Sequence, residues 1–149
     1  MVRRLALLVA MLALLLASGA TAADSKRVAE MKHVVREWSR MLNAGDNAGL
    51  ARLFKLPVTM EQAFLAYRLK TKQHVALWHN GLPCSGRIRS ITVKGNKATA
   101  VFVLGHRPTS RCNTPGGLAA AEFEIVDGKI VHWVQVPVPD PPALPDPAT

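Results

Sequence analysis

The chain contains two cysteines, Cys84 and Cys112, which are its residues with the clearest chemistry. A cysteine can act as a nucleophile, bind a metal or form a disulfide bond. A nucleophile needs a neighbouring base and a lowered pKa, and nothing at this spacing supplies either. A structural zinc site needs about four ligands, more than two isolated cysteines provide. We therefore expect a Cys84–Cys112 disulfide, provided that the chain folds in an oxidising compartment.

The N-terminal segment indicates such a compartment. Two arginines precede an unbroken apolar run over residues 5–17, and the small residues 20–22 fit an A-x-A cleavage pattern. This is the layout of a secretory signal peptide, and the run is shorter than the ~20 apolar residues of a membrane-spanning helix. We expect a signal peptide over 1–22, cleaved after Ala22 or Ala23, and a secreted or periplasmic cell-envelope protein without a stable membrane span. An uncleaved N-terminal anchor is the alternative.

The charge of the chain is strongly basic, with 19 Lys and Arg against 10 Asp and Glu and a formal net charge of +9. Such a balance raises the question of nucleic-acid binding. However, the basic residues are scattered and no run of them alternates with aromatic residues, so we expect no nucleic-acid partner. We interpret the charge as a solvated surface that would suit an anionic cell envelope.

The histidines do not predict a metal site. His74 and His79 are five positions apart on a predicted helix, which places them off a common face, while His33 and His106 stand alone. We therefore expect no metal ion and no other cofactor. His132 lies in a predicted hairpin, and the register of that hairpin decides whether its imidazole can reach a ligand.

Helices are expected in the first half of the chain. Apolar residues recur every three or four positions over 28–42, which predicts an amphipathic helix. Asp24 or Ser25 is expected to cap its start and Gly45 to end it.

Two shorter helices are expected to follow. The first begins at Asp46 or Asn47, extends through Phe54 and stops at Pro57. The other is predicted over residues 71–81, with a threonine as its cap and a glycine at its end.

Residues 57–70, which lie between these two helices, fit two structures. Apolar residues alternate with polar or small ones over 65–70, as they do in a strand. Met60, Phe64 and Tyr67 are also spaced as on one face of a helix. We choose a short hairpin.

The second half predicts two β-hairpins. The stretch RIRSITVKGNKATAVFVLG holds two β-rich runs around Gly95-Asn96, and AAAEFEIVDGKIVHWVQV holds two around Asp127-Gly128. A loop rich in proline and glycine separates the hairpins. Helices followed by an antiparallel meander indicate an α+β domain whose sheet is covered on one face by the helices.

The C-terminal segment over 137–149 is rich in proline and cannot contribute to a core. We expect it to form an extended or disordered tail. The predicted organisation is thus a folded domain over 23–136, between the signal peptide and this tail.

The register of the last hairpin places His132. A two-residue turn at 127–128 pairs Phe123 with His132, so His132 is expected to face the apolar side of the sheet and Trp133 the wetter outer side. A histidine there could exchange a proton with a ligand. The alternative is a histidine at the edge of the core whose hydrogen bonds are satisfied by a neighbour.

Two stretches carry a family resemblance. LNAGDNAGLARLF (42–54) resembles the helix-turn-helix of the NTF2-like superfamily, which includes SnoaL-like proteins and ketosteroid isomerase, and EFEIVDGKIVHW (122–133) is similar to the final hairpin of that superfamily. The resemblance covers residues 28–136 in architecture. It implies a cone of three N-terminal helices packed on a bent antiparallel sheet, with a pocket between the sheet and the first helix. It does not imply one activity, because one fold hosts many functions.

Ketosteroid isomerase chemistry depends on three residues: an aspartate base, and a tyrosine and a protonated aspartic acid that donate hydrogen bonds. The resemblance places the tyrosine at Trp38, the aspartic acid at Ala121 and the base at Glu61 or Gln62. Ala121 can donate nothing, and loss of one such donor raises a barrier by ~2.7–4 kcal/mol. Ketosteroid isomerisation is therefore not expected. Glu61 can still be read either as a base or as a solvated turn carboxylate.

The aromatic side chains are candidates to line an apolar pocket, although each could equally be part of the core. They are Trp38, Phe64, Tyr67, Trp78, Phe102 and Phe123. The leading hypothesis is an exported SnoaL-like domain that binds a small hydrophobic molecule. One alternative is a lyase, isomerase or hydrolase that uses Glu61 and His132. The other is a homodimeric envelope interaction module that uses the outer sheet face with Trp133.

Overall fold

The computed structural model describes the backbone of residues 2–140 and the side chains of residues 21–140. The predicted signal peptide over 1–22 lies almost wholly outside the described side chains, and most of the predicted tail lies outside the described residues. In chain order, the elements are α1 (Val2–Ala44), α2 (Asn47–Ala51), β1 (Phe54–Gln62), β2 (Leu65–Leu69), α3 (Lys72–Asn80), β3 (Cys84–Lys94), β4 (Lys97–His106), β5 (Leu118–Val126) and β6 (Lys129–Val136).

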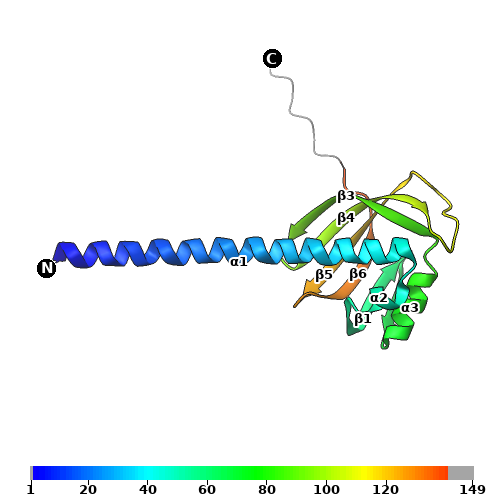
Figure 1. Ribbon diagram of the computed structural model, residues 1–149, viewed down its shortest axis with the longest axis horizontal. Coiled ribbons are helices and arrows are strands. Elements are labelled where there is room, and N and C mark those ends of the chain that lie inside the picture. The colour runs from blue at the N-terminus through cyan, green and yellow to red at the C-terminus, as the bar shows by residue number, and fades with distance from the viewer. Residues whose placement is uncertain (1, 141–149) are drawn as a thin grey trace, which may run out of the picture.

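Six strands form one bent sheet in the order β2-β1-β6-β5-β4-β3. All neighbouring strands are antiparallel except β1 and β6, which run parallel. The C-terminal half of α1 crosses the concave side of the sheet, with α2 and α3 grouped near its end (Figure 1). The predicted α+β architecture is confirmed, while the parallel pairing of β1 with β6 was not predicted.

Helix α1 buries the face that its sequence spacing predicts but starts earlier than expected. The helix runs through Asp24 and Ser25, so the predicted cap there is wrong, and Asp24 instead pairs with Arg27 one turn later. Gly45 ends the helix, as predicted, with a φ of 74°. The buried side chains of α1 are Met31, Val34, Val35, Trp38 and Leu42.

The predicted extension of the second helix to Phe54 is wrong. Asp46 caps α2 by accepting a hydrogen bond from the Gly49 N–H, and the helix ends at Ala51. Phe54 begins β1 because the chain there pairs with Ile130 of β6. The pairing supplies hydrogen bonds from outside the local sequence, so tertiary contact overrides the local helical pattern.

The remaining local predictions are confirmed. Residues 57–70 lie in the β1–β2 hairpin rather than a helix. The Thr71 hydroxyl accepts from the backbone N–H of His74 and caps α3, which ends at Gly81. Both predicted hairpins form around their expected turns, with a register shift in β3 close to Ser90.

Candidate functional site

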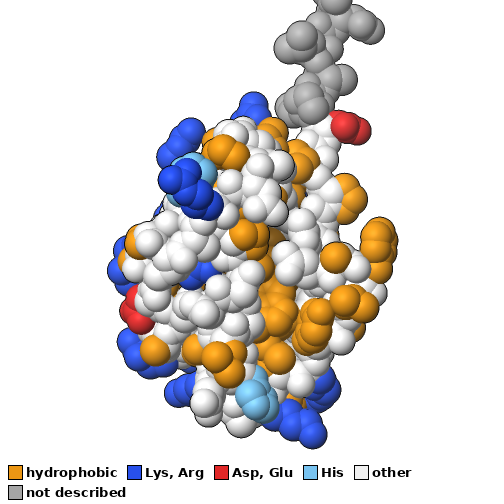
Figure 2. All heavy atoms as spheres, turned by 90° about the vertical axis from the view of Figure 1, so that its right-hand side faces the viewer, with side chains coloured by type: hydrophobic (Ala, Val, Ile, Leu, Met, Phe, Trp, Pro, Cys, Tyr) orange, Lys and Arg blue, Asp and Glu red, His pale blue; other side chains and the backbone are white. Residues whose placement is uncertain are grey.

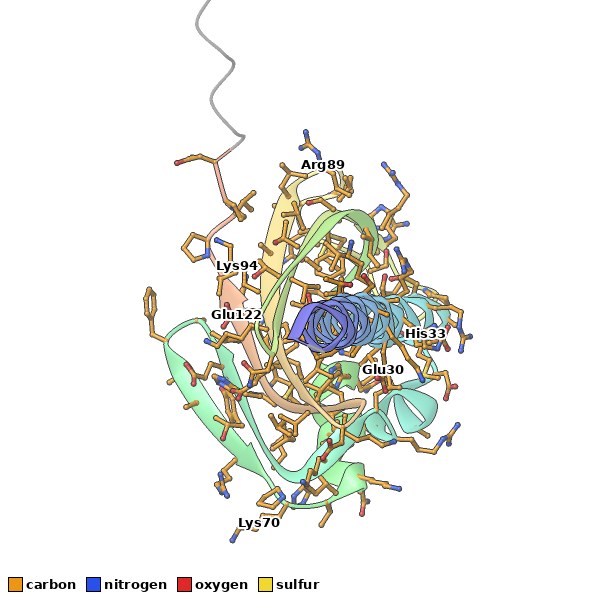
Figure 3. The ribbon with its side chains drawn as sticks, turned by 90° about the vertical axis from the view of Figure 1, so that its left-hand side faces the viewer. Glu30, His33, Lys70, Arg89, Lys94 and Glu122 are labelled. Atoms are coloured by element: carbon orange, nitrogen blue, oxygen red, sulfur yellow. A yellow bond between two sulfur atoms is a disulfide. The ribbon has the colours of Figure 1, made fainter. Side chains whose placement is uncertain are left out.

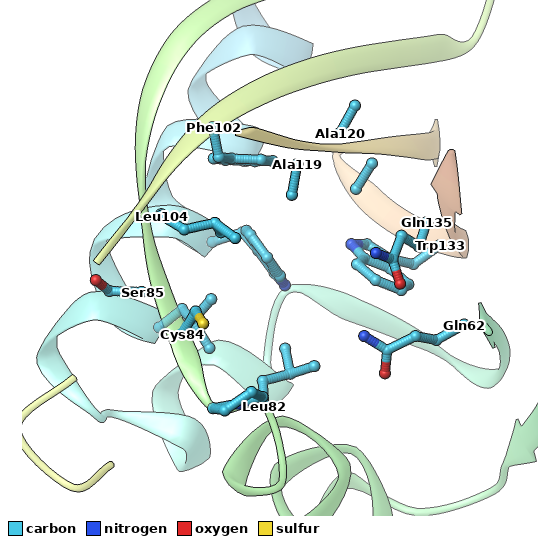
Figure 4. Close-up of a pocket in the computed structure, with 15 residues that line it drawn as sticks. Gln62, Leu82, Cys84, Ser85, Phe102, Leu104, Ala119, Ala120, Trp133 and Gln135 are labelled. Atoms are coloured by element: carbon cyan, nitrogen blue, oxygen red, sulfur yellow. The ribbon is translucent and has the colours of Figure 1, made fainter. Parts of the chain in front are cut away.

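A cavity of about 180 Å³ lies between α1 and the concave side of the sheet. Aromatic rings and aliphatic side chains form most of its lining (Figure 4). These residues are Trp38 and Leu42 from α1, Leu82 and Pro83 after α3, Phe102 and Leu104 from β4, Ala119 and Ala121 from β5, and Trp133 from β6. The alanines of β5 leave the space that larger side chains would fill.

The polar lining of the cavity is sparse and carries no charge. Gln62 of β1 and Gln135 of β6 lie on neighbouring strands along one side (Figure 4), and Ser85 lies on another. Trp133 also lines the cavity, and its buried Nε1 has no hydrogen-bond partner among the described residues. The two amides can orient a polar group of a ligand, but neither of them is a base at neutral pH.

Trp38 is held in place from behind the cavity by a buried histidine. The Trp38 Nε1–H donates to Nε2 of His79 at 3.0 Å. Because that nitrogen accepts, the proton of the neutral ring is on Nδ1, which donates to the Val75 carbonyl at 2.8 Å. Burial lowers the pKa of His79 to about 4, and the nearby Arg107 charge acts in the same direction. The imidazole is therefore neutral, and the indole N–H of Trp38 is already used.

Residues 82–86 form one wall of the cavity, and a disulfide bond fixes this wall. The predicted Cys84–Cys112 disulfide is present, with a Cα–Cα distance of 4.4 Å. The Ser110 hydroxyl donates to the Pro83 carbonyl at 2.9 Å. The wall is thereby tied to the loop between β4 and β5.

The buried, positively charged side chain of Arg107 stabilises the same wall. The Arg107 guanidinium donates to the carbonyls of His79 and Leu82, each at 2.7 Å, and to Oδ1 of Asn47 at 3.0 Å. Burial lowers the pKa of Arg107 from its usual value, but a guanidinium remains charged at physiological pH. Since these partners come from α2, α3 and the segment after α3, one side chain joins three parts of the chain.

The prediction that His132 faces the apolar side is wrong, and so is the prediction that Trp133 faces outward. Ile125 pairs with Ile130 as the turn requires, but Val131 is an extra residue, so Phe123 pairs with Trp133 rather than with His132. A single extra residue reverses which side chains face inward beyond it. Trp133 is 4% exposed against Phe123, so it cannot supply the predicted outer contact of a dimer.

Glu61 and His132 nevertheless meet on the outer side of the sheet. The His132 Nε2 lies 2.8 Å from Oε1 of Glu61, with both side chains partly exposed. The neighbouring residues Gln62 and Trp133 line the cavity, and successive side chains of a strand point to opposite faces. The pair is therefore separated from the cavity by the sheet itself.

The three positions taken from the isomerase resemblance offer no base to the cavity. Trp38 lines it, but its N–H is bonded to His79. Ala121 lines it without a polar group, and of the two candidates for the base it is Gln62 rather than Glu61 that lines it. The residue set of the isomerase is therefore absent from this cavity.

The six predicted pocket aromatics have different surroundings. Trp38 and Phe102 line the cavity. Phe123 is fully buried in the core, and Trp78 packs against the rings of His79 and Trp133. Phe64 and Tyr67 are exposed on the surface. The roles of these residues in ligand binding remain predictions.

Gln62, Gln135 and Trp133 all line the cavity. The sequence interpretation named Gln62 only as an alternative base, placed Trp133 on the outer face and did not single out Gln135. Their inward direction depends on pairing between β1 and β6 and on the extra residue Val131. One pattern in the sequence could have placed Gln62. Residues two apart in a strand share a face, so Gln62 is expected on the same face as Met60.

In the part of the chain that the structure describes, no group of three or more His, Cys, Asp or Glu side chains could hold a metal ion. Within the same part, no helix is long and apolar enough to cross a membrane.

Comparison with solved structures identifies the fold. No family model matches the chain, and no curated protein matches it. An NTF2-like protein of unknown function from Burkholderia xenovorans is similar over 78% of this chain and 91% of its own, with a TM-score of 0.57 and 16% identity. A candidate polyketide cyclase from Sinorhizobium meliloti is similar over 70% and 94%, with a TM-score of 0.56 and 17% identity.

A candidate ketosteroid isomerase from Kribbella flavida is also similar, over 78% of this chain and 85% of its own, with a TM-score of 0.56 and 16% identity. The chain thus has the NTF2-like superfamily fold. Identities this low support the fold alone, so the function has to be argued from the site.

Proposed function

We propose that this protein is an exported NTF2-like domain that binds a small hydrophobic molecule in the cavity between α1 and the sheet. The observation that carries the proposal is the composition of the lining, which combines aromatic rings and small apolar residues with two uncharged amides. Binding sites for small molecules typically show this combination of apolar walls and a few polar groups. At about 180 Å³ the cavity suits a ligand smaller than most drugs.

The polar groups indicate what such a ligand would carry. Gln62 and Gln135 supply the amide groups of the lining. A carbonyl or ether oxygen of the ligand could accept from either amide. The ligand would then be mainly apolar, with one or two acceptor atoms.

Export is the second part of the proposal. The Cys84–Cys112 disulfide is of a kind that persists mainly in oxidising compartments. The N-terminal sequence has the layout of a signal peptide. An intact mass measured on protein recovered outside the cytoplasm would test this part by locating the N-terminus of the chain.

Filling the cavity is expected to abolish binding. In an Ala119→Leu variant, three added carbon atoms occupy the space beside Phe102, and affinity for the uncharged apolar probe N-phenyl-1-naphthylamine should fall at least tenfold. Quenching of the tryptophan fluorescence would follow binding, because Trp38 and Trp133 line the cavity.

The matched control for this experiment is Ala48→Leu, which adds the same atoms at an exposed position of α2. It should bind the probe as the wild type does. Equal probe affinity in all three proteins would contradict the proposal, and native mass spectrometry of the wild type would search in parallel for a retained ligand.

Catalysis by Glu61 and His132 is the second candidate, favoured by their 2.8 Å contact. A carboxylate that orients an imidazole can support proton transfer. The pair lies outside the cavity, so we expect no hydrolysis of para-nitrophenyl acetate above the buffer rate. If hydrolysis were found and then lost in both Glu61→Gln and His132→Gln, but kept in a control Glu122→Gln on the same sheet face, the enzyme would replace the binding protein as the better proposal.

A further inference from the structure

The stretch from the β1–β2 turn to α3 exposes large apolar side chains. Phe64 is fully exposed, at 110% of the reference area, while Leu65, Tyr67 and Leu77 are exposed by 58%, 41% and 61%. Isolated exposed apolar residues are common, but four of them within one short stretch are not. We call this set, together with the basic residues described next, the β2–α3 surface.

The same stretch is basic and carries no acid. Arg68, Lys70 and Lys72 are exposed, and no Asp or Glu occurs over 62–80. The nearest acidic residue along the chain, Glu61, is held by His132 on the outer side of the sheet. Leu65 and Tyr67 alternate with Arg68 along β2, so the apolar and basic side chains point to opposite faces of this strand. Because β2 is an edge strand of the sheet, the β2–α3 surface is an edge at which the two faces meet.

The turn itself favours exposure of the phenylalanine. Ala63 and Phe64 have φ values of 51° and 65°, a region that two-residue hairpin turns usually fill with asparagine and glycine. A left-handed backbone is unfavourable for residues with side chains such as these. Neither the backbone strain nor the exposed ring stabilises the isolated domain, and the ring is free to contact a partner outside it.

This surface lies beside one wall of the cavity. Leu65 and Tyr67 pair with Gln62 and Met60, so all four side chains lie on the concave side of the sheet. Gln62 also lines the cavity. Figure 2 shows hydrophobic side chains gathered over the centre and right of this side of the molecule, with basic side chains at its lower edge.

We propose that the β2–α3 surface docks on an anionic lipid bilayer, with the side chains of Phe64 and Leu65 inserted between the lipid headgroups. Aromatic and aliphatic tips flanked by Lys and Arg suit the boundary between headgroups and acyl chains. Each basic residue near an anionic membrane strengthens binding by about fivefold at moderate salt. This proposal goes beyond ligand binding, and neither depends on the other.

The test is co-sedimentation of the full chain with vesicles. One vesicle preparation contains phosphatidylcholine alone, and the other contains equal parts of phosphatidylcholine and phosphatidylglycerol. We expect binding to the anionic vesicles that weakens as salt is added. Affinity should fall at least tenfold in Phe64→Ser/Leu65→Ser, and also in Arg68→Gln/Lys70→Gln/Lys72→Gln.

A matched charge control lies at the other edge of the sheet. Arg87→Gln/Arg89→Gln/Lys94→Gln removes the same charge from exposed positions of β3, and Figure 3 shows Arg89 and Lys94 far from Lys70. This variant should retain most of the affinity. With vesicles present, amide hydrogen exchange should be slower over residues 63–77. This readout is local, so it does not depend on vesicle contacts made by the N-terminal apolar run.

Several outcomes would overturn the proposal. These are no binding to anionic vesicles, equal losses in the two charge variants, and vesicle binding without protection over 63–77. A wild-type dimer that Phe64→Ser/Leu65→Ser converts to a monomer would instead assign the surface to a second copy of the chain. The probe measurement of the cavity uses no lipid, so its result does not depend on vesicle binding. A failure of the membrane-docking proposal can therefore be distinguished from a failure of the proposed function.

Discussion

Replacing both cysteines by serine is expected to lower the free energy of unfolding by about 3.5 kcal/mol. The disulfide between Cys84 and Cys112 spans a sequence separation of 28. In the chain-entropy model, its loss frees a loop of that size in the unfolded state. Urea unfolding of the wild type and of Cys84→Ser/Cys112→Ser under oxidising conditions would measure the difference.

The wild type itself provides the control for this prediction. In the presence of a reducing agent, its unfolding midpoint should move to that of the double variant, whose own midpoint should not respond. The variant should also bind the apolar probe more weakly, because Cys84 belongs to the cavity wall. A midpoint that is the same with and without the disulfide would show that Arg107 and Ser110 are sufficient to hold the wall.

Acidification is expected to destabilise the protein by about 3 kcal/mol between pH 7 and pH 4 through His79 alone. Burial lowers the pKa of His79 to about 4 in the folded protein, whereas a histidine in the unfolded chain titrates near 6.5. Below pH 6.5 the unfolded state therefore binds a proton that the folded state does not bind. Stability is complete above that pH and falls progressively as the pH approaches 4.

A His79→Gln variant isolates this contribution. The glutamine can accept from the Trp38 Nε1–H but does not titrate, so the free energy of unfolding should depend less steeply on pH over this window. Denaturant unfolding at several pH values would give both slopes. Identical slopes for the two proteins would mean that His79 becomes protonated inside the folded domain, in conflict with its complete burial and its two hydrogen bonds.

Features of the fold that depend on local chemistry were predictable from the sequence. Gly95-Asn96 and Asp127-Gly128 are residue pairs typical of tight turns, so both hairpins were identified, and Gly95, Asp127 and Gly128 adopt positive φ values. Thr71 and Gly81 delimit α3 by capping. The disulfide followed from the expected compartment and from the number of cysteines.

Features that depend on distant pairing were not predictable. Phe54 has apolar neighbours at helical spacing, and only its pairing with Ile130 shows that it belongs to a strand. The extra residue Val131 leaves the turn unchanged yet exchanges the directions of His132 and Trp133. No local rule separates these alternatives, because each is compatible with the same hydrophobic pattern.

The same division applies to the candidate site: positions set by a local pattern were predictable, and positions set by distant pairing were not. Trp38 was placed correctly because the face of a long amphipathic helix follows from its period. That Gln62 and Gln135 lie together was not predictable, because they meet only through the parallel pairing of β1 with β6. Of the six predicted pocket aromatics, Trp38 and Phe102 line the cavity, whereas Trp133 was predicted to face outward.

The parallel contact between β1 and β6 also has a consequence for biosynthesis. Strand β1 joins the rest of the sheet only through β6, which comes last in chain order among the strands of this sheet. Until that strand arrives, β1 with β2 and the β3–β5 meander remain two separate pieces with unpaired edges, and contacts this distant in sequence form slowly. A chain emerging N-terminus first thus cannot complete its sheet before its final strand is free, and during this interval the open edges need protection from other chains.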